Sequence, residues 1–257
     1  MVYHFKISLF ILSTVVLFAR CNKKDAYLIL DVKEVRIGNL IDVKLKETLG
    51  GTILDSNIYP KIYDQIQNAQ SVLKLPMENF FSAYSDKFLI LNDTIPRIFV
   101  CINGNIYLST GLLKSIQTFD ELSALFAHCY THVQQHDITK EIIKKYGSED
   151  YDKAYFAKDI SSLVGIDKMI TDEVFTITQE RLADDSCLSV LTRLETSKVL
   201  ALSLINLNFS GGSNIGFYAM HPNYEGRIAS LMQRSSSVLN NYTMKMEEYE
   251  IFLNQLP

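Results

Sequence analysis

Three histidines stand at four-residue intervals in one stretch of the chain: His128, His132 and His136. Upstream, Thr118-Phe119-Asp120-Glu121 predicts a capping box, in which the threonine side chain accepts a hydrogen bond from a free backbone N–H and the glutamate reaches back. Apolar residues then recur at helical spacing: Leu122, Leu125, Phe126, Cys129 and Val133. We therefore expect a long helix with an apolar stripe and with imidazoles on one side, and the rest of the fold has to accommodate it.

The first two of these histidines have the spacing of metal ligands. His128 and His132 are four residues apart, so both imidazoles project from the same helix face, one turn apart. Such a pair can reach one zinc ion at about 2.0–2.1 Å. The same spacing also occurs on solvated helix faces, so the metal hypothesis requires a third ligand.

A second predicted helix offers that ligand in the run Gln179-Glu180-Arg181-Leu182-Ala183-Asp184-Asp185. Glu180 would complete a set of two histidines and one carboxylate, which catalytic zinc uses when one position stays open for water. Asp184 lies one turn further on the same face and could accept the free N–H of a ligand histidine. The alternative for Glu180 is an exposed helix charge paired with Arg181 or Lys168.

Elsewhere the pattern predicts an α+β fold that is mainly helical, with a small antiparallel sheet. Short apolar strands are expected at 88–91, 98–102 and 106–108, and Asn103-Gly104 between the last two is the strongest hairpin signal in the chain. Residues 26–58 leave strand and helix both open. Further helices are expected at 60–74, 168–193, 195–207, from Pro222 through Leu231, and at 243–254, with a polar loop at 208–213.

The first 21 residues differ from the rest. Lys6 precedes an apolar run from Ile7 to Phe18, which is typical of a signal-peptide core and short for a membrane span. The segment resembles a bacterial lipoprotein signal with Cys21 as the lipidated residue, although Arg20 stands where a small residue is usual. An uncleaved N-terminal anchor is the alternative. Either outcome predicts an exported protein of the cell envelope or periplasm, with a possible membrane tether.

Composition narrows the remaining choices. A formal net charge of -4 gives no basic footprint for nucleic acid. No linker rich in proline, glycine or serine divides residues 22–257, so we expect a single domain there. The four cysteines are Cys21, Cys101, Cys129 and Cys187. If Cys21 carries a lipid, the remaining odd number argues against a complete disulfide framework.

Four segments together resemble one family of zinc metallopeptidases. Residues 104–113 are similar to its strand and turn before the zinc helix, and residues 120–128 to the approach to its first ligand. Glu180 with Ala183-Asp184 resembles its third-ligand motif, and His221-Pro222 with Glu225, Arg227 and Ile228 its later His-Pro segment. The family is that of the HtpX heat-shock protease and the CAAX prenyl endopeptidases, peptidase family M48. Four ordered matches over roughly residues 97–230 are far more specific than any one alone.

The resemblance implies a zincin-like domain of the gluzincin type. His128, His132 and Glu180 would bind one Zn²⁺, and Asp184 would support a ligand histidine. His221 would be a cleft residue near the metal. Strand 97–102 would pair with the backbone of an extended polypeptide substrate or client.

One position departs from the family motif at its centre. The family has glutamate directly after the first histidine, whereas this chain reads His128-Cys129-Tyr130-Thr131-His132. That glutamate acts as general base and then as proton donor to the leaving amine. Cys129 has a shorter side chain and an ordinary pKa of about 8.5, so it is expected to pack as a small apolar residue. At His136-Asp137 the family tends to have a basic residue followed by histidine.

Three hypotheses follow from this departure. The first is a zinc metalloendopeptidase whose cleavage of internal peptide bonds is impaired, with Cys129 at the general-base position and His221 or a carboxylate handling the proton. The second is a pseudo-peptidase that binds polypeptide as a chaperone-like module. The third is a fold that has lost zinc, and the retained His128, His132 and Glu180 argue against it.

Overall fold

The computed structural model of the chain describes residues 23–172, 175–194, 224–234 and 246–257. The expected helix at 195–207, the loop at 208–213, His221, Pro222 and the N-terminal segment with Cys21 lie outside the described residues. Within the described part, no helix is both long and apolar enough to cross a membrane.

Helices dominate the described chain, as expected. Before the sheet come α2 (Lys23–Leu49), the short 3-10 turn η1 (Gly50–Thr52), α3 (Pro60–Ser71) and α4 (Glu78–Ala83). After it come α5 (Thr110–Ser115), α6 (Phe119–Gln134), α7 (Asp137–Tyr146), α8 (Ser148–Ala157), α9 (Ile166–Asp172), α10 (Ile177–Arg193), α13 (Tyr224–Arg234) and α14 (Met246–Leu253). The open question at 26–58 is thereby settled as helix up to residue 49.

The sheet is small and mixed. Its strands β1 (Phe88–Leu91), β2 (Ile98–Val100) and β3 (Ile106–Ser109) lie in the order β1-β3-β2. The hairpin predicted at Asn103-Gly104 is confirmed, because β2 and β3 pair antiparallel and Gly104 adopts a positive φ of 92° there. The expectation of a wholly antiparallel sheet was wrong, since β1 pairs parallel to β3. The turn at 92–94 therefore leads into a crossover rather than a second hairpin.

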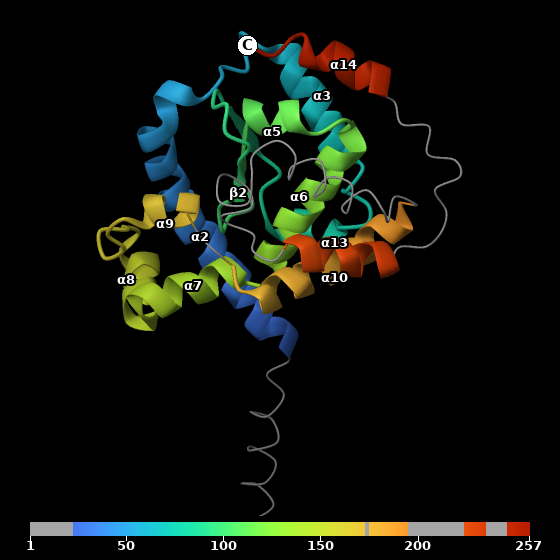
Figure 1. Cartoon of the computed structure of the whole chain (residues 1–257). Coiled ribbons are helices and arrows are strands. Elements are labelled where there is room, and N and C mark those ends of the chain that lie inside the picture. Colours follow the sequence, from blue (N-terminus) through green and yellow to red (C-terminus); the bar gives the residue numbers. More distant parts are fainter. Residues whose placement is uncertain (1–22, 173–174, 195–223, 235–245) are drawn as a thin grey trace, which may run out of the picture.

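Helix α6 lies at the centre of the molecule. Figure 1 shows it (green) beside the sheet, with α10 and α13 side by side at its lower end. It packs against α3, α10 and β2, and every side chain from Glu121 to Val133 is buried. The imidazoles of this helix therefore face other protein groups and not solvent.

Two details of the helix starts differ from expectation. Thr118 accepts from the backbone N–H of Glu121, as predicted, but the Glu121 carboxylate accepts from the N–H of Gln117 rather than of Thr118. The single helix expected at 168–193 is two helices, α9 and α10. A reciprocal capping box of Thr176 and Gln179 begins α10. Such a box marks the first turn of a separate helix.

The three cysteines in the described residues are free and buried: Cys101, Cys129 and Cys187.

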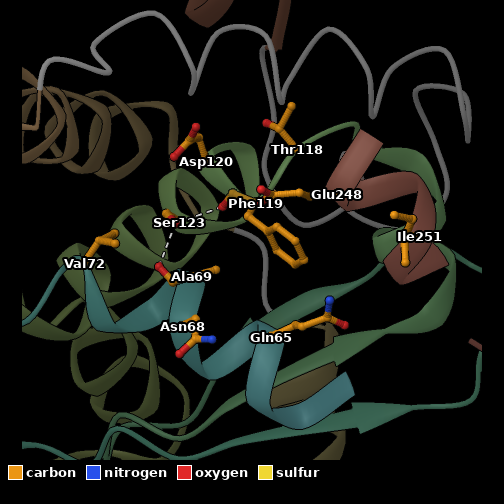
Figure 2. A pocket seen from close by; sticks show the side chains of 10 residues that line it. All are labelled: Gln65, Asn68, Ala69, Val72, Thr118, Phe119, Asp120, Ser123, Glu248 and Ile251. Atoms are coloured by element: carbon orange, nitrogen blue, oxygen red, sulfur yellow. Dashed lines mark hydrogen bonds between the residues drawn. The ribbon is translucent and has the colours of Figure 1, made fainter. Parts of the chain in front are cut away.

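The pocket in Figure 2 lies near the start of α6, where Phe119 and Ser123 face Ala69 of α3 and Ile251 of α14. Ser123 Oγ donates to the carbonyl oxygens of Ala69 and Phe119 there. None of the predicted zinc ligands lines this pocket.

Candidate metal centre

Helices α6 and α10 bring the three predicted ligands together. His128 and His132 project from α6, and Glu180 projects from the first turn of α10, where its backbone N–H bonds to the Thr176 carbonyl at 3.0 Å. All three side chains are at most 1% exposed. The alternative in which Glu180 is an exposed helix charge is therefore wrong.

The three ligand side chains form a compact triangle. The two Nε2 atoms of His128 and His132 are 3.2 Å apart. One carboxylate oxygen of Glu180 lies 3.4 Å from the His132 Nε2, and the other lies 3.4 Å from the His128 Nε2. We call this set, His128, His132 and Glu180, the ligand triangle.

The far nitrogen of each histidine faces a carboxylate. His128 Nδ1 is 3.2 Å from Oδ1 of Asp184, the residue that the sequence places on the ligand face of the second helix. His132 Nδ1 is 3.0 Å from Asp137 Oδ2, and its ring also stacks on Phe175 at a centroid distance of 3.9 Å. An Nδ1–H donated to a carboxylate directs the Nε2 lone pair into the triangle, which is how metal-binding histidines are usually oriented.

A buried arginine completes the electrostatics of the site. Arg227 of α13 is 2% exposed. Its guanidinium donates to both oxygens of Asp184 at 2.7 and 2.8 Å, and lies 2.5 Å from a Glu180 oxygen. Its Nη2 is also 3.4 Å from His128 Nε2. One cation thus faces two buried carboxylates, which leaves a net negative charge that favours a further cation.

These contacts shift the pKa values of the surrounding groups. Burial opposes ionisation of Asp184, but hydrogen bonds from Arg227 and His128 prevail and lower its pKa to about 2. Burial likewise opposes protonation of His132, yet Asp137 and Glu180 raise its pKa. Burial opposes the charge of Arg227, while Glu180 and Asp184 raise its pKa.

The residues present fit a zinc ion. Two nitrogens bound tetrahedrally at about 2.0–2.1 Å would be separated by about 3.3 Å, close to the observed 3.2 Å between the Nε2 atoms. Two imidazoles and one carboxylate are a donor set that zinc accepts, and both imidazoles have the supporting carboxylates that the metal-binding tautomer requires.

Cys129 is buried next to this triangle. It is 2% exposed and belongs to the hydrophobic core. Burial raises the pKa of its thiol, and the charge of Glu180 raises it further. The side chain is therefore a neutral thiol at neutral pH, which agrees with packing as a small apolar residue.

Three contributors to the site were missed at the sequence level. Asp137 and Phe175 orient His132, and Arg227 pairs with both Glu180 and Asp184. The resemblance to the family included Arg227 in the His-Pro segment but gave it no role. Asp137 belongs to the pair His136-Asp137, where the chain differs from the family motif. His136, the third histidine of the spacing, is not in the triangle and instead faces Glu34 of α2.

A comparison with models of protein families matches the part of the chain that contains this site. The family model described as Peptidase family M48 matches residues 61–235, which include the whole ligand triangle, Asp184 and Arg227. Helix α2 lies before the matched range. A search of curated proteins found no match.

Proposed function

The chain belongs to peptidase family M48, and from this premise we propose that it binds one zinc ion at the ligand triangle as a metalloendopeptidase-like protein with impaired hydrolysis of internal peptide bonds. The observation that carries the proposal is the triangle itself. Its donor atoms are 3.2 to 3.4 Å apart and fully buried, while a neutral cysteine follows the first histidine.

Each residue of the site has a defined part in this proposal. His128, His132 and Glu180 hold the ion, Asp184 and Asp137 fix the two imidazoles, and Arg227 keeps the carboxylates paired. Zinc, when bound, would polarise a substrate carbonyl and lower the pKa of a water molecule. The missing part is a group that takes the proton from the attacking water and delivers it to the leaving amine.

Cys129 is poorly suited to that task for two reasons. Its thiol has a raised pKa, so it does not accept a proton at neutral pH. Its side chain is shorter than glutamate by about two bonds, and it packs in the core. Loss of a general base typically lowers the rate by about 10²–10⁴-fold, so we expect slow cleavage or none. His221 stays the candidate for any residual proton transfer and lies outside the described residues.

A second candidate function is a pseudo-peptidase that binds extended polypeptide. The supporting observation is β2, which is an edge of the sheet among the described strands. An extended segment could add to such an edge through backbone hydrogen bonds.

Export, processing at Cys21 and lipid attachment are a separate proposal, which mass spectrometry of the mature N-terminus from the native host would test.

Restoring the glutamate tests the proposal directly. We expect Cys129→Glu to cleave unfolded casein about 10²–10⁴-fold faster than wild type, and a chelator to abolish the gain. Cys129→Gln is the matched control, because it has the same length without a base. Circular dichroism and metal analysis of both variants establish folding and zinc content. A folded, zinc-loaded Cys129→Glu that is no faster than Cys129→Gln would contradict this interpretation of the site.

A further inference from the structure

Helix α6 is joined to α7 by two residues, Gln135 and His136, of which His136 is in a left-handed conformation. His136 has φ 57° and ψ 29°, and it is one of two described non-glycine residues with positive φ. For an L-residue this conformation costs roughly 1–2 kcal/mol, and glycine usually occupies such a position. Histidine adopts positive φ more often than most non-glycine residues, and here its side chain also makes a contact distant in sequence.

The His136 side chain bonds to a buried carboxylate on α2. Its Nδ1 lies 2.9 Å from Glu34 Oε2, and Glu34 is 1% exposed. The hydroxyl of Thr139, in the first turn of α7, donates to Glu34 Oε1 at 2.5 Å, and the Tyr84 hydroxyl, just after α4, donates to Glu34 and also contacts Asp31. We call these five residues the Glu34 cluster: Asp31, Glu34, Tyr84, His136 and Thr139.

The next residue after His136 acts on the ligand triangle. Asp137 is 1% exposed, and its Oδ2 lies 3.0 Å from His132 Nδ1 while its Oδ1 accepts from Lys140 at 2.9 Å. Its side chain can reach back to α6 only because His136 turns the chain sharply at this point. The backbone bonds from His136 N–H to the Val133 carbonyl and from Lys140 N–H to the His136 carbonyl fix that turn.

From these contacts we propose that Glu34 is a positioning residue for the zinc ligand His132. It holds His136 and Thr139 on both sides of the turn, so that Asp137 meets His132 Nδ1. The inference rests on the proposed zinc site. Because α2 precedes the family-matched range, it also assigns a function to a helix that the family match does not cover.

The test compares two buried carboxylates of the same helix. Glu34→Gln removes the charge and places an amide NH₂ among hydroxyl and imidazole donors. Asp42→Asn is the matched control, because Asp42 is 6% exposed and accepts from the Tyr107 hydroxyl at 2.6 Å, as Glu34 does from Tyr84, but lies away from the turn. Zinc affinity of the full chain is measured by competition with a chromophoric chelator, beside thermal unfolding.

Residues that orient a metal-binding histidine typically contribute 10–100-fold to affinity. Glu34 acts through Asp137, so we expect Glu34→Gln to weaken zinc binding about tenfold, at the lower end of that range, and to change the visible spectrum of the Co²⁺ form. Asp42→Asn should destabilise the fold without changing either metal readout. His136→Gly keeps the backbone conformation and should lose the same tenfold. The double variant Glu34→Gln/His136→Gly should lose no more than either single variant.

Three results would overturn the inference. Unchanged affinity in Glu34→Gln, with a stability loss like that of Asp42→Asn, would limit Glu34 to a structural role. Independent, additive losses in the double variant would separate Glu34 from the turn. A second zinc per chain that Glu34→Gln removes would make the cluster a metal site, since Asp31, Glu34 and His136 offer ligand atoms within 4.8 Å of one another. Absence of zinc from wild type would instead remove the proposed function, and this inference with it.

Discussion

The ligand triangle and the Glu34 cluster both combine histidine with a buried glutamate, yet their donor and acceptor atoms are oriented differently. In the Glu34 cluster, hydroxyl and imidazole donors converge on one carboxylate, so donors within the cluster supply the hydrogen bonds that this buried carboxylate needs. Around the triangle, carboxylate oxygens lie 3.0 to 3.2 Å from the outer nitrogens of both histidines, and the two Nε2 atoms face each other at 3.2 Å. Two imidazole lone pairs at that distance favour a cation between them. The orientation of donors thus distinguishes a structural support from a metal centre.

The largest effect is expected from removing the cation that lies beside the triangle, Arg227. Arg227→Met would leave Glu180 and Asp184 buried without their partner, and breaking such a pair typically costs 3–5 kcal/mol of unfolding free energy. Urea unfolding measures the loss, and Arg193→Met on the exposed face of α10 is the control. Saturating zinc should recover part of the loss in Arg227→Met. A variant as stable as wild type without zinc would contradict the charge balance proposed for the site.

A smaller effect is expected from the contact that links the two regions. Asp137→Asn should weaken zinc binding about 10–100-fold. The substitution replaces the charged carboxylate that faces His132 Nδ1 by a neutral amide, so His132 is held less firmly in its metal-binding orientation. Asp150→Asn, at a half-buried position of α8 that pairs with Lys153, should leave the affinity unchanged. Equal affinities in chelator competition would show that Phe175 stacking alone orients His132, and the two regions would then be uncoupled.

The smallest effect is a pH dependence confined to the Glu34 cluster. Burial opposes protonation of His136, but Glu34 and Asp31 raise its pKa, while Lys140 counteracts them. A raised pKa in the folded state stabilises the protein below the unfolded value of about 6.5. This contribution should be lost as the pH rises through the higher folded value. NMR titration of His136 and unfolding from pH 5 to 9 check it, and His136→Gly should lack this component. A folded pKa at or below 6.5 would contradict the prediction.

The sequence predicted the triangle because its signals are local. The His128/His132 spacing and the run from Glu180 to Asp184 each lie within one helix, where periodicity alone places side chains on a face. The support of His132 was not predictable in this way. Asp137 acts across a left-handed turn that needs Glu34, about 100 residues away, and Arg227 approaches from a separate helix. The same limit explains the sheet, because parallel pairing of β1 with β3 depends on a crossover and not on a hairpin signal.

Zinc content of the purified full chain tests the central claim most directly. After dialysis against trace zinc, metal analysis should find one zinc per chain in wild type and in Glu34→Gln, and close to none in His132→Gln or Glu180→Gln, with all four proteins folded by circular dichroism. A wild type without zinc, or zinc retained in both triangle variants, would show that the ligand triangle is not a metal centre.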